Sequence, residues 1–368
     1  MSIVSPGSRF VLGGRASRSR ARIVCHYRGM PDTEPPTEFL APPLVAYAFE
    51  AVAPVLLGMD AETWVPTDEV NLARAILALT AVDMTKVVLV VTGDMVASTR
   101  ERLPQDQRGA FSDERGAGML GGKTMAVGDE VHVLMPFWLY VDPEAAASLM
   151  SETEAAEFLA GTEARGELAR RTIVHEAQHV LMTQKGEAGV KLADARARRD
   201  FLFLAHDVID EYRAELGVPA NLRAAFEYEV APETLPAFRD GLKREVQDYQ
   251  RRRGVEDLMY GVLAQAQHAW KALANVAAAR RVGAIAEPIG TDLSGWDELA
   301  APYWERFEEL LRSAPAPSER FTPEAHRELL ETVADLFDEW LQGLGFLWRN
   351  IDDGRNAEFK ITSRHIVG

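Results

Sequence analysis

Strand-like segments are concentrated in the first part of the folded region and nearly vanish after it, and this asymmetry constrains the possible folds more than any other feature. Residues 86–91, KVVLVV, form the β-branched run that is typical of a buried strand. Residues 123–127 and 130–139 flank Gly128-Asp129, a two-residue turn signal that predicts a β-hairpin. Beyond Asp142 the apolar residues recur at helical spacing instead. This order predicts an α+β fold with a small mixed sheet, followed by a predominantly α-helical C-terminal region.

Turn-forming residues divide the helical part. Gly217-Val218-Pro219 ends one long helix, so we place a domain boundary there. We predict three parts: an arm at 1–43 that is basic, then acidic and Pro-rich, and is expected to be disordered; a folded domain at 44–217; and a helical region at 218–368. The predicted helices span residues 45–57, 68–82, 144–160, 164–184, 192–216, 234–252, 255–281, 296–313 and 323–344.

Composition excludes several classes of protein. The net charge of −16 makes nucleic acid an unlikely partner class. Cys25 is the single cysteine, which excludes internal disulfides and sites built from several thiolates, and favours a cytoplasmic location. The most apolar long run, residues 39–59, is interrupted by three prolines and Glu50, so we expect no membrane span. The arginine-rich start lacks the continuous apolar core of a signal peptide.

Two histidines one helical turn apart carry the clearest chemical signal. In the run His175-Glu176-Ala177-Gln178-His179 both imidazoles share one helix face, from which they can bind one metal ion. The surrounding segment, 172–182, is apolar on nearly all sides, and burial of two histidines and a carboxylate is costly without partners. A zinc ion there would acidify a bound water, and Glu176 would be placed to accept its proton. The pattern therefore predicts metal-assisted hydrolysis.

This segment resembles the active-site helix of the zincin metallopeptidases. Their extended signature has Thr or Val three residues before the first histidine, uncharged residues between the ligands and apolar residues after them. The residues that agree with it are Thr172, Ala177, Gln178, Val180 and Leu181. The resemblance implies a zincin-like domain in which an extended peptide substrate pairs with the edge strand of the sheet. We expect residues 130–135 to form that edge, with His132 in a structural role.

Two histidines leave a zinc site one protein ligand short. The metzincin branch requires Gly and His where this chain has Met182 and Lys185, and Cys25 lies in the basic arm. The downstream helix offers acids instead, in an arrangement that resembles that of the gluzincins. Glu211 continues an apolar stripe that should face the core, and Glu215 is the next candidate. The stripe consists of Leu204, Val208, Glu211 and Glu215.

Other polar residues leave alternatives open. Asp207 or Asp210 would orient a ligand imidazole, and His206 is an alternative ligand. The candidates for an oxyanion-stabilising donor are Tyr212, Tyr228 and His206. The histidines without ligand-like spacing are His268, His326 and His365. The run Gly121-Gly122-Lys123-Thr124 lacks the first glycine and the preceding strand of a phosphate-binding loop, so we interpret it as a flexible connection into the hairpin.

The sequence thus predicts a zinc-dependent metallopeptidase that acts on peptide or protein substrates with one Zn²⁺ ion. His175, His179 and Glu211 would be its ligands, and Glu176 its general base. One alternative is a non-catalytic helical interaction or regulatory protein with a structural or vestigial zinc site. Another is a zinc hydrolase that cleaves amide bonds outside peptides.

Overall fold

The computed structural model describes residues 44–59, 65–105, 108, 121–187, 195–224, 234–284 and 293–363. The predicted arm at 1–43, with Cys25, lies outside the described residues, as do Tyr228 and His365. Residues 42–368 group into a single compact unit.

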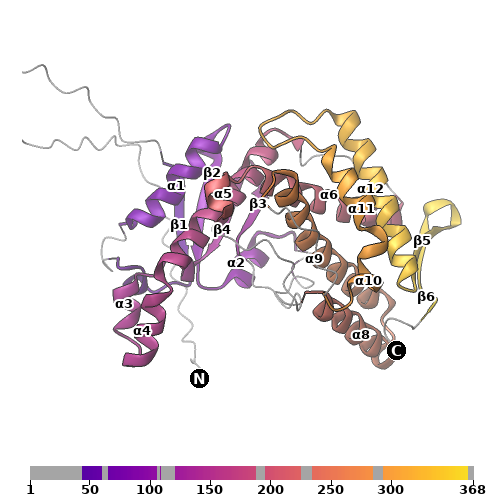
Figure 1. Ribbon diagram of the computed structural model, residues 1–368, viewed down its shortest axis with the longest axis horizontal. Helices are drawn as coiled ribbons and strands as arrows, with labels where there is room; N and C mark the ends of the chain where they lie inside the picture. The colour runs from indigo at the N-terminus through magenta and orange to yellow at the C-terminus, as the bar shows by residue number, and fades with distance from the viewer. Residues whose placement is uncertain are drawn as a thin grey trace, which may run out of the picture. The chain divides into compact units, whose positions relative to one another are not determined.

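A four-stranded mixed sheet forms the first part of this unit (Figure 1). Its strands follow the order β1-β2-β4-β3, in which β1, β2 and β4 run parallel and β3 runs antiparallel to β4. Their bounds are β1 Ala46–Glu50, β2 Val87–Thr92, β3 Lys123–Val127 and β4 Glu130–Pro136. The β-branched strand β2 has a partner on each side, as expected for a run of valines that is apolar on both faces. β1 and β3 are therefore the edges of the sheet.

Two predictions about this region are wrong. Residues 130–135 belong to β4, which is internal because β2 pairs with its other side, so the edge of the predicted hairpin is β3. Residues 45–57 hold β1 and then the short helix η1, Pro54–Leu57, instead of one long helix. Parallel pairing with β2 keeps β1 extended, and Gly58, with a φ of 64°, ends η1.

Helices α1 (Asp68–Thr80) and α5 (Thr162–Gln184) pack on this sheet in one apolar core (Figure 1). Alternate residues of β2 and β4 contribute to that core, as the two-residue period of a strand requires. Its buried members include Val87, Leu89, Val91, Val131, Val133, Met135, Val70, Ala73, Leu77, Ala169, Ile173, Ala177 and Val180. The helix that carries the histidine motif, α5, is thus held against the sheet by apolar contacts. The short helix α2 (Met95–Arg102) contacts β4.

The later helices build a second apolar core. Helix α6 packs against α9 and α12, and α8 packs against α9. The bounds are α6 Arg196–Leu216, α8 Thr234–Arg252, α9 Val255–Arg281, α11 Ala301–Arg312 and α12 Pro323–Gly343. Trp270 of α9 lies at the centre, with its ring centroid 4.5 Å from that of Phe307 and 5.1 Å from that of Phe337. These aromatic contacts join α9, α11 and α12.

The helices predicted beyond Asp142 are confirmed, with local differences. The segment 144–160 is split into α3 (Pro143–Ala147) and α4 (Glu152–Ala160), because Ser151 caps α4 in a capping box with Glu154. The segment 296–313 is split into α10 (Trp296–Leu299) and α11. A C-terminal hairpin, which the sequence analysis does not predict, follows α12. The remaining elements are β5 Phe346–Ile351, β6 Asn356–Ile361, α7 Ala220–Ala224, η2 Met84–Lys86, η3 Phe137–Tyr140 and η5 Asp352–Gly354.

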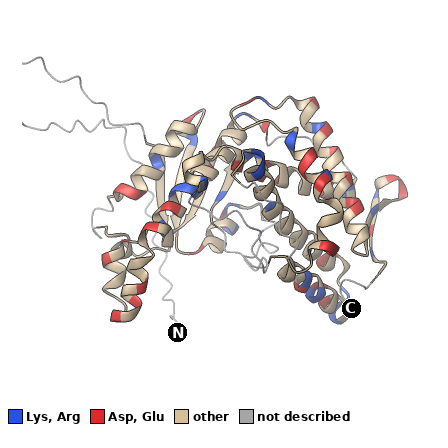
Figure 2. Cartoon of the chain, viewed as in Figure 1, with Lys and Arg blue, Asp and Glu red and all other residues tan. Residues whose placement is uncertain are grey.

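The predicted α+β class, with a small mixed sheet and a predominantly helical C-terminal region, is confirmed. One core contains the sheet with α1 and α5, and the other contains α6 and the helices from α8 to α12. The domain boundary at 217 and 218 stays a prediction. Acidic and basic side chains are spread over the described helices, although α3 and α4 carry glutamates and no lysine or arginine (Figure 2). None of the described helices contains an apolar stretch long enough to cross a lipid bilayer.

Candidate metal centre

Contacts between α5 and α6 bring together the three residues that the sequence selects as metal ligands. Nε2 of His175 lies 3.3 Å from Nε2 of His179. Nε2 of His175 also lies 3.1 Å from Oε1 of Glu211, and Nε2 of His179 lies 4.0 Å from Oε2 of Glu211. One donor atom from each residue falls within 4.8 Å of the other two. We call these three residues the α5–α6 cluster.

The spacing of the donor atoms suits a tetrahedral zinc ion. Ligand atoms that lie about 2.0–2.2 Å from zinc at tetrahedral angles are roughly 3.3–3.6 Å from one another. The N···N distance of 3.3 Å and the N···O distance of 3.1 Å are close to that range. A small rotation of the Glu211 side chain would shorten its 4.0 Å distance from His179. Two imidazoles and one carboxylate would then hold the ion, and the fourth position would remain for water.

Glu215, one turn after Glu211, contacts the other nitrogen of His175. Its Oε2 lies 3.1 Å from Nδ1 of His175 and 2.7 Å from Nη2 of Arg171, and its side chain is fully buried. A carboxylate on the outer nitrogen fixes the orientation and tautomer of a ligand imidazole. The structure therefore places the second-ranked ligand candidate in the orienting position.

Glu176 is directed toward the edge strand β3. Thr124 donates a hydrogen bond from Oγ1 to Oε2 of Glu176 at 2.7 Å, and Glu176 is only 6% exposed. Gly122, just before β3, lies so close that a Cβ atom there would be 2.8 Å from Oε1 of Glu176. The interpretation of residues 121–124 as a mere connection misses both contacts. The glycine pair before the strand is the only sequence signal for this close approach.

Burial and charge set the pKa values of the cluster in different directions. Burial opposes protonation of His175, but Glu211 and Glu215 outweigh it and raise its pKa to about 10. Burial and the charge of His175 lower the pKa of His179 to about 3. Burial alone would raise the pKa of Glu211, yet His175 holds it well below its usual range. Burial also raises the pKa of Glu176. Without metal, both ring nitrogens of His175 are therefore protonated, Nε2 toward Glu211 and Nδ1 toward Glu215, and a metal ion would displace the proton on Nε2.

Lys271 of α9 adds a positive charge beside the cluster. Its Nζ lies 3.7 Å from Oε2 of Glu211 and 3.7 Å from Oδ2 of Asp207. Asp207 also accepts a hydrogen bond from Nε2 of Gln267. Asp207 therefore contacts α9, and no contact of its carboxylate with a ligand imidazole is found in the described part of the chain.

The structure places the other candidate residues away from the cluster. His132 accepts a hydrogen bond at Nδ1 from Nε of Arg102 at 2.9 Å, which agrees with the structural role expected for it. Arg281 donates to the hydroxyl of Tyr212 at 3.3 Å, and the Tyr212 side chain belongs to the second apolar core. His206 and Asp210 lie together on a different face of α6. The oxyanion donor thus stays unassigned.

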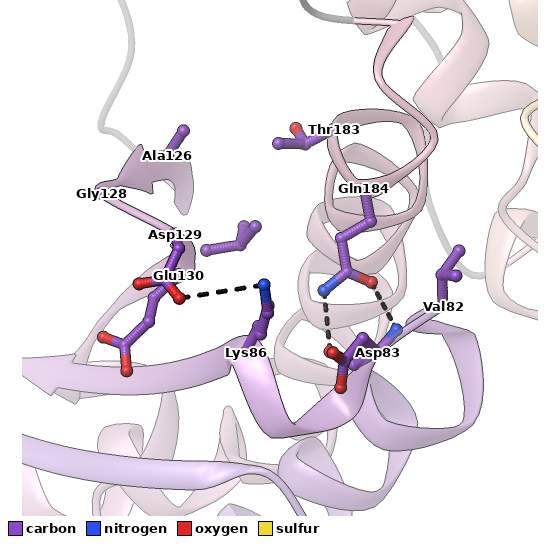
Figure 3. Close-up of a pocket in the computed structure, with 10 residues that line it drawn as sticks. Val82, Asp83, Lys86, Ala126, Gly128, Asp129, Glu130, Thr183 and Gln184 are labelled. Carbon is purple, nitrogen blue, oxygen red and sulfur yellow. Dashed lines mark hydrogen bonds and ion pairs between the residues drawn. The ribbon is translucent and has the colours of Figure 1, made fainter.

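A surface cavity of about 350 Å³ lies between the C-terminal end of α5 and the β3–β4 turn (Figure 3). Gln184 bridges to the backbone of Asp83 on one side of it through two hydrogen bonds, of 3.0 and 2.8 Å. Lys86 and Asp129 form a 3.8 Å ion pair on the other side. The residues of the α5–α6 cluster do not line this cavity, so it is separate from the candidate metal centre.

Comparison with protein-family models, with curated proteins and with solved structures finds no match to this chain.

Proposed function

We propose that this chain is a zinc-dependent metallopeptidase of the zincin type, with His175, His179 and Glu211 as the ligands of one Zn²⁺ ion. The observation that carries the proposal is the convergence of two imidazole nitrogens and one carboxylate at the spacing of a tetrahedral site, on the helix pair that the sequence motif selects. The resemblance to the zincin signature, with a glutamate between the two histidines, supports hydrolysis over a purely structural site.

The residues around the cluster support a general-base reaction. Zinc bound there would lower the pKa of a coordinated water and polarise the carbonyl group of the substrate. Glu176 accepts the proton of the attacking water and returns it to the leaving amine. Thr124 holds the Glu176 carboxylate through its 2.7 Å hydrogen bond, so the base is fixed before the substrate binds. Glu215, which is itself paired with Arg171, orients the ring of His175 from the other side.

The edge strand β3 supports an extended peptide as the substrate. An edge strand offers backbone N–H and C=O groups to which a peptide can be added as a further strand. Thr124 lies in β3 and contacts Glu176, so a peptide bound along β3 would pass beside the general base. The expected edge at 130–135 is thereby replaced by 123–127. A cytoplasmic location stays a prediction from the single cysteine.

One observation favours the alternative of a zinc site without catalysis. The ammonium group of Lys271 lies 3.7 Å from Oε2 of the ligand candidate Glu211. A cation at that distance opposes a second cation at the same carboxylate. In this alternative the helical region after Gly217 would bind a partner protein, and the zinc would serve the structure only.

The Glu176→Gln variant separates these functions. The full chain is loaded with one equivalent of Zn²⁺ and incubated with a library of fluorescence-quenched peptides. We expect the wild type to cleave peptides, and Glu176→Gln to lose about 10²–10⁴-fold in rate while its zinc content stays unchanged. Glu167→Gln, on the same helix α5 but outside the cluster, is the matched control and should behave as the wild type.

Equal turnover by Glu176→Gln and the wild type would refute the mechanism. A wild type that binds zinc but cleaves none of the peptides would favour the non-catalytic alternative. Cleavage of other amides in place of the peptides would identify a different class of substrate for the same site.

A further inference from the structure

A second group of metal-binding side chains lies on another face of α6. His206 and Asp210 come from α6, and His326 comes from the first turn of α12. Nε2 of His206 lies 3.5 Å from Oδ2 of Asp210, and the ring centroids of His206 and His326 are 5.6 Å apart. One donor atom from each of the three residues lies within 4.8 Å of the other two.

One polar atom of each residue in this group is buried and has no hydrogen-bond partner among the described residues. Nδ1 of His206, Oδ1 of Asp210 and Nε2 of His326 make no hydrogen bond to any residue that the structure describes. His326 is only 2% exposed. Buried polar atoms are nearly always hydrogen-bonded or bound to an ion, so three orphan atoms in one group require an explanation. A ligand in their midst supplies one.

The second group is independent of the α5–α6 cluster. Successive residues of a helix are rotated by about 100°, so Asp210 and Glu211 point in different directions from α6. Asp210 accordingly lies with His326 of α12, while Glu211 lies with His175 of α5. The two groups share no residue, and each can bind or lose an ion on its own.

The surroundings of the second group suit a cation. Phe321 stacks on His326 at a centroid distance of 4.6 Å and covers one face of the imidazole. Arg213 lies on Phe321, with Cζ 4.9 Å from the ring centroid, and it is fully buried and paired with Glu187 at 2.5 Å. Arg213 also donates to the carbonyl of Pro315 at 2.9 Å, which uses a further guanidinium proton. The carboxylate of Glu187 therefore offsets the charge of Arg213, which otherwise opposes a cation beside His326.

We propose that His206, Asp210 and His326 form a second metal site, for a divalent transition metal of the zinc class. Two imidazoles and one carboxylate form a donor set that suits zinc. Magnesium and calcium prefer sites made of oxygen ligands. The donor atoms lie within 4.8 Å of one another. Side-chain rotations that move each donor atom by about 1 Å would bring them to the spacing of a tetrahedral zinc site. The ion would tie the start of α12 to the middle of α6.

The test measures metal content in a chain whose first cluster is broken. The full-length His179→Ala protein is stripped of metal, loaded with Zn²⁺ and freed of loosely bound ions by gel filtration. We expect about one zinc per chain, and a value near zero once His326→Gln is added. Adding His132→Gln to His179→Ala instead is the matched control, since His132 contacts Arg102 in the sheet, and should leave the zinc content unchanged.

Thermal unfolding followed by circular dichroism provides the second readout. Zn²⁺ should raise the Tm of the His179→Ala protein by a few degrees and leave that of His179→Ala/His326→Gln unchanged. If the glutamine variant does not fold, Asp210→Asn replaces it, because it retains the shape of the side chain. Retention of zinc in the folded double variant would overturn the proposal. So would the absence of zinc from folded His179→Ala protein, which would mean that the group holds only water.

Discussion

Replacing Gly122 with alanine is expected to displace Glu176 without removing any residue of the α5–α6 cluster. A Cβ atom at position 122 would lie 2.8 Å from Oε1, 2.9 Å from Cγ and 3.0 Å from Cδ of Glu176. Ordinary van der Waals contact begins at 3.4 Å, so the carboxylate must retreat by roughly half an ångström. That movement lengthens its 2.7 Å hydrogen bond from Thr124 beyond good geometry.

The magnitude of the effect follows from this displacement. Overpacking of a buried site costs about 1–3 kcal/mol of unfolding free energy. A misplacement of about 1 Å in a catalytic group can cost about 10²-fold in rate, so half that distance should cost roughly tenfold in the proposed hydrolysis. The zinc content should not change, because the three atoms nearest to the new methyl group all belong to Glu176, which is not one of the proposed ligands.

Gly121→Ala is the matched control. A Cβ atom at position 121 would meet its nearest neighbour, Cγ2 of Thr172, at 3.8 Å, which is an ordinary contact. Urea-induced unfolding, zinc content and cleavage of the quenched peptides are measured for both variants. If Gly122→Ala and Gly121→Ala have the same unfolding free energy and the same rate, the close approach of residue 122 to Glu176 is refuted.

Two further predictions concern zinc binding. Glu215→Gln should weaken zinc binding about 10–100-fold, because an amide holds Nδ1 of His175 less firmly than a carboxylate does. Competition with a chelator measures the change in affinity. An affinity equal to that of the control Glu167→Gln would contradict the orienting role of Glu215. The pKa of His175 without metal is about 10, so zinc binding below that pH releases one proton. The apparent affinity for zinc should therefore rise about tenfold per pH unit from pH 6 to 8, which the same competition at several pH values tests. An affinity that does not change with pH would contradict a protonated His175.

The sequence predicts the helices well because their apolar spacing reflects the core that each one faces. The apolar stripe that Glu211 continues is an example, since its member Val208 is fully buried in the second apolar core. Glu211 follows that stripe toward α5, where it meets His175. Periodicity thus points to Glu211, whereas the motif and its resemblance to the zincin signature point to His175 and His179.

Strand order depends on pairings that no local pattern encodes. β1, with the sequence AYAFE, has few β-branched residues and is extended because β2 lies beside it. β4 is internal because β2 also pairs with it, although its own sequence fits an edge strand equally well. The hairpin of β5 and β6 was missed because its strands, FLWRNI and NAEFKI, contain few β-branched residues and follow a long helical region.

The contacts that hold Glu176 and Glu215 in place could not be predicted from neighbouring residues in the sequence. The contact of Thr124 with Glu176 joins residues 52 positions apart, and that of Glu215 with Arg171 joins residues 44 positions apart. The second metal-binding group depends on His326, whose partners lie on another helix. Such contacts exist only after the helices pack, and spacing along the chain gives no measure of them.

The residues of the α5–α6 cluster come from the two different apolar cores, the histidines from the helix packed on the sheet and the glutamate from the helix packed in the helical region. A metal ion bound there would link the two cores, and its binding free energy would stabilise the packing of α5 against α6. Chelation would then act first on the junction of α5 and α6, because each core retains its own apolar contacts. Hydrogen exchange would increase at that junction while the centre of the sheet and the region around Trp270 stayed protected.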